Sequence, residues 1–252
     1  MRIALISDIH ANLPALEAVL ESIDSRGAIA ATYHLGDLVG YAPWPNETVD
    51  LVRARGILGI AGNYDSTVAT DHPHCGCRYE NEHEAQLSHE GYTWTQTNVS
   101  AETKAFLAAL PFRLDLRPRG GHAGGPRLCL VHGTPTLNTL YWTEGQPDSF
   151  CTSMAARAGL GDGDVIGFGH THKPWHRIVE GVHFVNTGSV GRPKDSDWRA
   201  GYVTLDLGGE EPNVEFHRVE YDLERAVAGI LSSSLPNEFA DVLRSGGAPK
   251  AE

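Results

Sequence analysis

The sequence predicts an α/β fold, in which strands and helices alternate along the chain. Three buried-strand candidates lie at 2–7, 31–35 and 57–61, and helix-like segments follow the first two at 12–23 and 46–55. This alternation is typical of right-handed βαβ units, whose helices pack on a sheet. With 252 residues, 41% apolar and 21% charged, the chain has the composition of a soluble globular protein and the length of one large domain.

The first elements carry local signals of where they begin and end. Asn12 is a typical N-cap, and Pro14 stands in the first turn of the helix that follows. The apolar run of the third strand stops at Gly-Asn-Tyr-Asp, residues 62–65, which favours a turn or an exposed loop.

The segment 66–110 interrupts the alternation, because it is polar and rich in histidine and aromatic residues. It predicts one helix at about 82–97 and a second short helix capped by Ser100. We expect this segment to be a cap-like insertion within a single domain that spans 1–245.

Strand signals return in the second half of the chain. They lie at 127–131, 164–168, 182–186, 201–207 and 214–220, and turn residues between the last three favour a meander. Helices are predicted at 223–230 and 237–243, and residues 246–252 read as a flexible tail.

Charge and cysteine content exclude several function classes. A formal net charge of −12 without a basic cluster argues against long nucleic acids and anionic membranes as partners. No apolar run reaches the roughly 20 residues that cross a bilayer, and the apolar start is too short for a signal peptide. Four cysteines are too few for a disulfide scaffold, so we expect a cytoplasmic protein in which Cys129 and Cys151 are packing residues.

Five of the predicted strands end next to side chains that bind metals. These side chains belong to Asp8, His10, Asp37, Asn63, His132, His170 and His172. Each has an ordinary alternative explanation as a cap or turn residue, but the carboxyl ends of strands in an open α/β sheet form the crevice where ligands bind. Two carboxylates, one amide and four imidazoles suit a first-row transition metal better than Mg²⁺ or Ca²⁺.

The order of these motifs resembles the signature of calcineurin-like metallophosphoesterases. The matching motifs are Asp8-x-His10, Gly36-Asp37, Gly62-Asn63, His132-Gly133 and Gly169-His170-x-His172. The stretch VNTGSVGRP at 185–193 is also similar to the NPGSV stretch of small bacterial and archaeal members. The resemblance implies a four-layer αββα sandwich, made of two mixed β-sheets flanked by helices.

The family's ligand scheme assigns the seven side chains to two divalent metal ions. It implies one ion held by Asp8, His10, Asp37 and His172, and a second held by Asp37, Asn63, His132 and His170. Asp37 would bridge them. Similarity to the family implies Mn²⁺ first, with Fe, Zn²⁺, Ni²⁺ or Co²⁺ as alternatives, and attack on phosphorus by a metal-bridging hydroxide.

Tyr64 departs from the family pattern, because many members carry a histidine after the ligand asparagine. That histidine contacts phosphate and helps to protonate the leaving alcohol. A phenol with an ordinary pKa of about 10 is a poorer proton donor near neutral pH, so Tyr64 favours phosphodiester or aryl-ester substrates. The alternative is that Tyr64 packs beneath the insertion.

Further substrate contacts are predicted from the insertion and from the stretch after the last ligand. The candidates are Tyr64, His74, Arg78, Tyr79 and Arg192. A third metal at 72–77 has little support, because the Cys-x-Cys spacing fits no standard zinc pattern.

The resemblance therefore implies a dinuclear metal-dependent phosphoesterase in which Asp37, Asn63, Tyr64 and His132 are catalytic. We expect a small, nucleotide-like phosphodiester as substrate, and the oligomeric state stays open. A phosphomonoesterase, a protein phosphatase or a dinucleotide polyphosphate hydrolase is the alternative, although Gly40 and Tyr41 replace the Asp-Arg-Gly segment of the protein phosphatases. A non-catalytic scaffold is disfavoured because all seven ligands are present.

Overall fold

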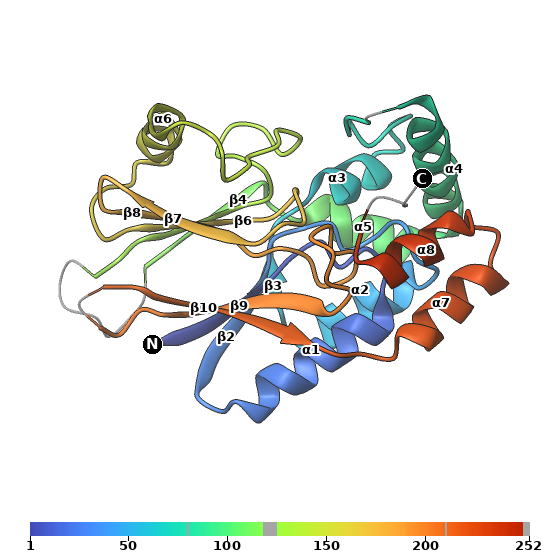
Figure 1. Cartoon of the computed structure of the whole chain (residues 1–252), viewed down its shortest axis with the longest axis horizontal. Helices are drawn as coiled ribbons and strands as arrows, with labels where there is room; N and C mark the ends of the chain where they lie inside the picture. Colours follow the sequence, from blue (N-terminus) through green and yellow to red (C-terminus); the bar gives the residue numbers. More distant parts are fainter. Residues whose placement is uncertain (80, 118–124, 210, 249–252) are drawn as a thin grey trace.

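Two five-stranded β-sheets stack face to face in the computed structural model, which describes residues 1–79, 81–117, 125–209 and 211–248. Helices cover the outer face of each sheet, so the layers run helix, sheet, sheet, helix (Figure 1). The predicted αββα sandwich is confirmed.

The first sheet has the strand order β10-β9-β1-β2-β3. Its strands are β1 (Arg2–Ile6), β2 (Ile29–His34), β3 (Leu58–Gly59), β9 (Ala200–Asp206) and β10 (Asn213–Val219). The strands β1, β2 and β3 are parallel to one another, whereas β9 pairs antiparallel with both β1 and β10. The sheet is therefore mixed.

The second sheet is also mixed and has the order β4-β5-β6-β8-β7. Its strands are β4 (Arg113–Leu116), β5 (Leu128–Val131), β6 (Val165–Phe168), β7 (Trp175–Val179) and β8 (Val182–Asn186). The central strands β5, β6 and β8 are parallel, and the two edge strands run antiparallel to their neighbours.

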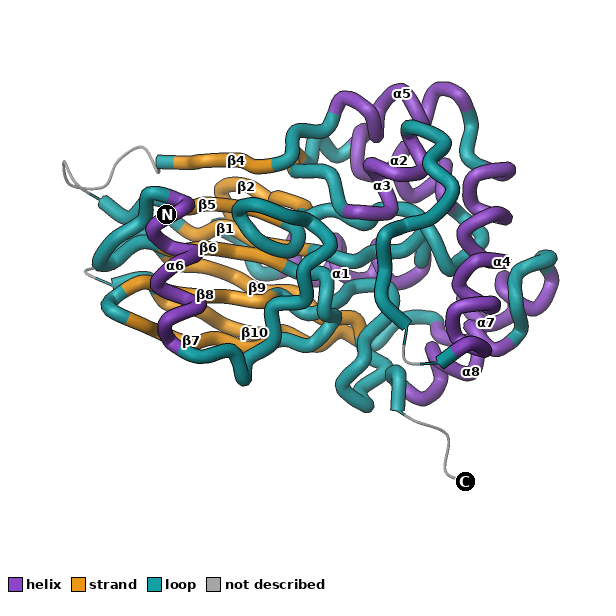
Figure 2. Tube along the Cα trace, turned by 90° about the horizontal axis from the view of Figure 1, so that it is seen from above, coloured by secondary structure: helices purple, strands orange, loops and turns teal. Residues whose placement is uncertain are grey.

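The helices fall into two sets. The outer layers contain α1 (Leu13–Ser25) and α2 (Pro45–Ala54) on the first sheet, and α6 (Asp148–Ala158) on the second (Figure 1). The other set gathers beyond one end of the sheets, as Figure 2 shows from above; it comprises α3 (Asn63–Ala69), α4 (Glu82–Asn98), α5 (Ala101–Ala109), α7 (Leu223–Ser232) and α8 (Glu238–Ser245).

The residues of β1 alternate between two apolar layers because successive strand side chains point to opposite faces. Ile3 and Leu5 belong to the cluster between the sheets, together with Leu130 of the second sheet. Ala4 and Ile6 belong to the cluster under the helices of the first sheet. Because β1 is buried on both faces, its position is fixed, and so is the start of the loop that carries the first predicted metal ligands.

Two predicted helix caps are confirmed. The side chain of Asn12 accepts a hydrogen bond from the backbone N–H of Ala15 at 3.3 Å, and α1 begins at the next residue, Leu13. The side chain of Ser100 likewise accepts from Thr103 N–H at 3.1 Å at the start of α5. These caps satisfy backbone donors that have no partner within the first helical turn.

The predicted meander is wrong. β8 lies in the second sheet beside β6 and β7, whereas β9 and β10 form a hairpin in the first sheet. The stretch 187–199 carries the chain from one sheet to the other, which turn residues alone do not reveal. The sequence patterns also did not indicate β4, β7 or α3.

The stretch 62–65 is buried and opens α3 instead of forming an exposed loop. The carboxylate of Asp65 explains this, because it accepts hydrogen bonds from Gly62 N–H at 3.0 Å and from Leu38 N–H at 2.9 Å.

At the start of the predicted tail, the carbonyl of Gly246 accepts a hydrogen bond from Ser196 N–H at 2.9 Å. Of the predicted tail, residues 249–252 lie outside the described residues.

Candidate metal centre

The seven predicted ligands converge at the ends of four strands. Asp8 and His10 follow β1, Asp37 follows β2, Asn63 opens α3, His132 follows β5, and His170 and His172 follow β6. All seven side chains are buried. Residues up to 164 positions apart in the sequence thus meet where strands of both sheets end.

The backbone of five ligands is left-handed, which the sequence did not indicate. Asp8, His10, Asp37, His170 and His172 have φ angles between 50° and 66°. This conformation costs an L-residue roughly 1–2 kcal/mol, and such strain gathers at functional sites, where the surrounding structure holds it in place. The strained turns let each strand end direct its side chain toward the same point.

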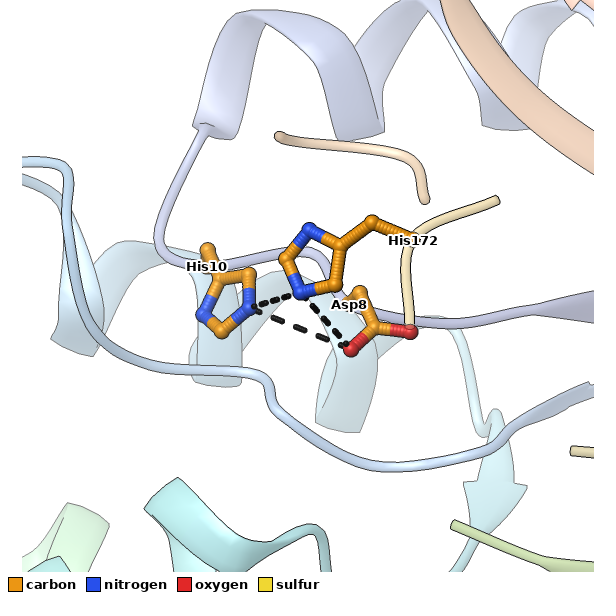
Figure 3. Close-up of side chains that lie close together, drawn as sticks. All are labelled: Asp8, His10 and His172. Atoms are coloured by element: carbon orange, nitrogen blue, oxygen red, sulfur yellow. Dashed lines mark hydrogen bonds and ion pairs between the residues drawn. The ribbon is translucent and has the colours of Figure 1, made fainter. Parts of the chain in front are cut away.

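The first group consists of Asp8, His10 and His172 (Figure 3). The Nε2 atoms of the two imidazoles are 3.2 Å apart, and His172 Nε2 lies 3.3 Å from Asp8 Oδ1. Ligands bound about 2.1 Å from one metal ion lie roughly 3 Å apart at right angles to each other. The spacing of these three atoms fits one shared ion.

Hydrogen bonds to the backbone determine which nitrogen of each imidazole faces the centre. The Nδ1 atom of His10 donates to Val39 carbonyl at 3.1 Å, and that of His172 donates to Arg192 carbonyl at 2.5 Å. A carbonyl only accepts, so Nδ1 carries the proton in both rings and each Nε2 presents a lone pair. Two lone pairs and a carboxylate oxygen facing one another repel unless a cation lies between them.

The second group consists of Asp37, His132 and His170. His132 Nδ1 donates to Leu35 carbonyl at 2.8 Å, so its Nε2 atom faces Asn63 Oδ1 at 3.0 Å, His170 Nδ1 at 3.2 Å and Asp37 Oδ2 at 3.4 Å. Burial lowers the pKa of His132, but the carboxylate of Asp37 overrides this effect and raises it to about 9, so Nε2 presents a lone pair to a metal once that proton is released. This set again places acceptor atoms together, as metal ligands require.

Asp37 lies between the two groups. Its Oδ2 atom is 3.4 Å from Nε2 of His132 in the second group and 3.7 Å from Nε2 of His10 in the first. Its other oxygen accepts a hydrogen bond from Tyr64 N–H at 2.8 Å, which fixes the carboxylate. An anionic ligand placed in this way is suited to bridge two cations.

The ionisation of the centre depends on its burial. Burial lowers the pKa of His10 to about 4 and that of His170 to about 3. Burial also raises the pKa of Asp8 to about 7, against the opposing effect of His132. Burial would raise the pKa of Asp37 as well, but the charges of His132 and His10 hold it at about 2. Metal binding would therefore meet mostly neutral imidazoles and release protons.

A family model for the calcineurin-like phosphoesterase superfamily domain matches residues 1–210. The chain belongs to this superfamily. An uncharacterized protein of Methanocaldococcus jannaschii is 32% identical over 256 residues, which cover 96% of each protein.

Two solved structures are similar to this phosphoesterase over nearly its whole length. A metallophosphoesterase from Sphaerobacter thermophilus is 29% identical with a TM-score of 0.75, over 98% of this chain and 100% of the other. A hypothetical protein from Pyrococcus horikoshii is 23% identical with a TM-score of 0.81, over 98% and 99%, and shows the same fold. No described helix is both long and apolar enough to cross a membrane.

Two motif glycines of the phosphoesterase allow the strand ends to approach one another. A Cβ atom at Gly62 would collide with the carboxylate and backbone N–H of Asp37. A Cβ atom at Gly169 would collide with Ser7 and with the carboxylate of Asp8. Both glycines stand directly before a ligand, so their missing side chains make room for ligands on neighbouring strands.

The insertion holds the ligand Asn63 in place. Its Nδ2 atom donates to Cys75 carbonyl at 3.0 Å and to Cys77 Sγ at 3.3 Å, which leaves Oδ1 to face His132. Cys75 and Cys77 form a disulfide, so neither sulfur is a free thiolate that could bind a metal. Within the described residues, the two metal-ligand groups do not include the 72–77 segment.

The other predicted substrate contacts occupy different environments. Tyr64 is 1% exposed, and its ring packs against those of His10, Tyr41 and Tyr92. Burial raises its pKa well above 10, with Tyr41 and Tyr79 adding to the effect. Contact between Tyr64 and substrate stays a prediction.

The remaining candidates lie on two segments around the centre. His74 and Arg78 are exposed on the loop of the insertion, and the Tyr79 hydroxyl lies 3.1 Å from Cys75 Sγ. The Arg192 guanidinium carbon lies 4.0 Å from the centroid of the Tyr41 ring. Their contact with substrate is likewise untested by the geometry alone.

Three residues near the centre were missed by the sequence analysis as site residues. The ring of Tyr41 lies 4.9 Å from that of His10, and the ring of Tyr141 lies 4.3 Å from that of His170. Burial lowers the pKa of His10, His170 and His172, and the positive charge of Lys194 adds to this effect in each case. Tyr41 lies close to the Gly36-Asp37 motif, and this position could have indicated it as a site residue, whereas nothing in the sequence marks Tyr141.

Proposed function

We propose that this phosphoesterase is a dinuclear metal-dependent phosphodiesterase. Its preferred metal would be Mn²⁺, and its substrate a small, nucleotide-like phosphate ester. One observation carries the proposal: two buried groups of lone-pair donors lie on either side of the carboxylate of Asp37. This arrangement matches the ligand scheme that the family resemblance implies.

Asp8, His10 and His172 would hold one ion, and Asn63, His132 and His170 the other, with Asp37 shared. Two such ions would activate water near neutral pH and stabilise charge on the phosphoryl oxygens. The protein contributes fixed ligand orientation, because backbone carbonyls of Leu35, Val39 and Arg192 each hold a ligand imidazole through Nδ1.

The environment of Tyr64 supports a diester rather than an alkyl monoester. A leaving alkoxide requires a proton, and imidazolium supplies one near pH 7 far better than a phenol. Burial raises the pKa of Tyr64 well above its ordinary value, so this hydroxyl is a weaker acid than a free tyrosine. Substrates whose leaving group tolerates negative charge are therefore favoured.

The test compares bis(4-nitrophenyl) phosphate with 4-nitrophenyl phosphate, using protein loaded with Mn²⁺, Ni²⁺, Co²⁺ or Mg²⁺. We expect kcat/KM for the diester to exceed that for the monoester by about tenfold or more. An alkyl monoester such as glycerol 2-phosphate should be slower than both by about a hundredfold or more, because only its alkoxide leaving group requires a general acid. Equal or faster monoester turnover would refute the diester preference. No turnover of either ester with any of the metals would favour a scaffold.

Variants locate the activity in the centre. His132→Ala removes a ligand of the second group, so we expect activity to fall by at least about a hundredfold while the fold is retained. His89→Ala is the matched control, because His89 is exposed on α4. Full activity of His132→Ala would refute the site.

A further inference from the structure

Two cations beside the first metal-ligand group lack the partners that other half-buried cations have. Arg192 and Lys194 are half-buried. Within the described residues, every other half-buried arginine or lysine forms an ion pair with a carboxylate within 4.0 Å; these residues are Arg2, Lys104, Arg113, Arg127, Arg177, Arg199 and Arg218. For Arg192 and Lys194, no carboxylate of the described chain lies that close.

A backbone contact places Arg192 next to the centre, and Lys194 follows two residues later. The carbonyl of Arg192 accepts the hydrogen bond from His172 Nδ1, so this residue is anchored to a metal ligand. Its guanidinium lies 4.0 Å from the ring of Tyr41, whose edge in turn lies against His10. Pro193 separates it from Lys194, and the turn at Gly247 packs against Lys194.

Two neighbouring cations and two carboxylates set the electrostatic environment of Lys194. Burial, Arg192 and Lys173 together lower the pKa of Lys194 itself to about 8, and the carboxylates of Asp8 and Glu84 oppose this shift. A half-buried ammonium that is repelled by a guanidinium is stabilised by an anion lying between the two.

The formal charge of the centre leads to the same conclusion. Two divalent ions carry more positive charge than the carboxylates of Asp8 and Asp37 neutralise, and Arg192 and Lys194 add to that excess. The chain as a whole has a net charge of −12, so this site is a local exception. A diester with one phosphate would leave the excess largely uncompensated.

We infer that Arg192 and Lys194 form an anion subsite for a second phosphate group of the substrate, next to the phosphoryl group held at the centre. The inference rests on the proposed phosphodiesterase function and narrows its substrate to esters that carry at least two phosphates. Arg192 binds a phosphate through its planar fork of N–H donors, while Tyr41 supports the opposite face of the guanidinium.

The experiment measures binding, so that it does not depend on turnover. Isothermal titration of Mn²⁺-loaded protein compares methylenediphosphonate, which has two phosphoryl groups and is not hydrolysed at its P–C–P link, with methylphosphonate, which has one. Metal content is measured after each titration, because a diphosphonate also chelates Mn²⁺. We expect Arg192→Gln and Lys194→Gln each to weaken diphosphonate binding about tenfold, and methylphosphonate binding less than about threefold.

Two further variants serve as controls. Lys173→Gln removes the same charge from an exposed lysine outside the subsite and should change both affinities less than about threefold, because Lys173 acts on Lys194 only through its charge. Arg192→Lys keeps the charge and should retain most of the diphosphonate affinity, which separates loss of the cation from local misfolding.

The outcomes distinguish the subsite from the proposed function. If the glutamine variants lose affinity for both phosphonates equally, or for neither, the subsite is overturned. Wild-type protein that hydrolyses bis(4-nitrophenyl) phosphate but binds the two phosphonates equally keeps its proposed function and loses the subsite. Wild-type protein that neither hydrolyses the diester nor binds either phosphonate overturns both.

Discussion

Replacing Gly62 by alanine tests whether the approach of two strand ends builds the centre. The backbone of Gly62 has φ −80° and ψ −177°, which alanine adopts without strain. The new methyl group would nevertheless collide with Asp37, the ligand shared by both groups. The effect of Gly62→Ala is therefore steric and falls on the carboxylate that the two ions require.

The magnitude follows from two opposing contributions. Overpacking a buried site costs about 1–3 kcal/mol, and replacing glycine by alanine returns about 0.4–1 kcal/mol by restricting the unfolded chain. The net loss of about 1–2 kcal/mol corresponds to a fall in Tm of about 2–8 °C for a chain of this length. The displaced carboxylate also reduces the bound metal to one ion or none.

The assay combines differential scanning calorimetry of the metal-free protein with elemental analysis of the metal-loaded protein. Gly145→Ala is the matched control, because a Cβ atom at Gly145 meets nothing within 4 Å. Unchanged Tm together with two ions per chain in Gly62→Ala would refute the steric reasoning.

Three further predictions concern the surroundings of the centre. Tyr64→His supplies an imidazole, so we expect kcat/KM for an alkyl phosphomonoester to rise by about tenfold or more relative to kcat/KM for the aryl diester, and an unchanged ratio would contradict the leaving-group argument. Gly76→Val should weaken metal binding about tenfold, because it would move the loop that orients Asn63. Gly76 has φ +74°, and a Cβ atom there would lie 2.9 Å from Thr139 Cγ2. Titration with Mn²⁺ measures the change in affinity. Asp164→Ala should lower the free energy of unfolding by about 1–3 kcal/mol at pH 7, because Arg127 and Gly161 hold the pKa of Asp164 below its ordinary value despite burial. A lowered carboxyl pKa stabilises the fold above the unfolded value of about 3.9 and less so as the pH falls through the folded value, so urea titrations should find a smaller difference near pH 3.

The ligand positions could be predicted because they depend on strand ends. A buried strand reads as an apolar run, and a polar residue of ligand type directly after it lies at the sheet edge by geometry alone. Asp8, Asp37 and His132 were found in this way, and the family resemblance ordered them into a scheme that the structure accommodates.

Other features depend on contacts that no local pattern encodes. The Nδ1 bonds of His10 and His172 reach carbonyls at Val39 and Arg192, which are distant in sequence and become neighbours only in the folded chain. The left-handed backbone at the ligands is imposed by the strand ends around them, since none of the five residues is a glycine. That no carboxylate of the described residues lies within 4.0 Å of Lys194 likewise appears only when its neighbours are known.

The sequence also did not indicate which strands belong to which sheet. Strand β8 has the same apolar character as β9, and both are followed by turn residues, so a meander was the simplest prediction. The parallel pairing of β8 with β6 is set by burial against Phe168 and Trp175 in the second sheet, which the sequence pattern does not specify.

The most direct test is a crystal structure of the Mn²⁺-loaded protein with anomalous diffraction at the manganese edge. The account predicts two anomalous peaks about 3.5–4 Å apart, with Asp8, His10 and His172 at one, Asn63, His132 and His170 at the other, and Asp37 in contact with both. A single peak, or two peaks of which only one contacts Asp37, would contradict it.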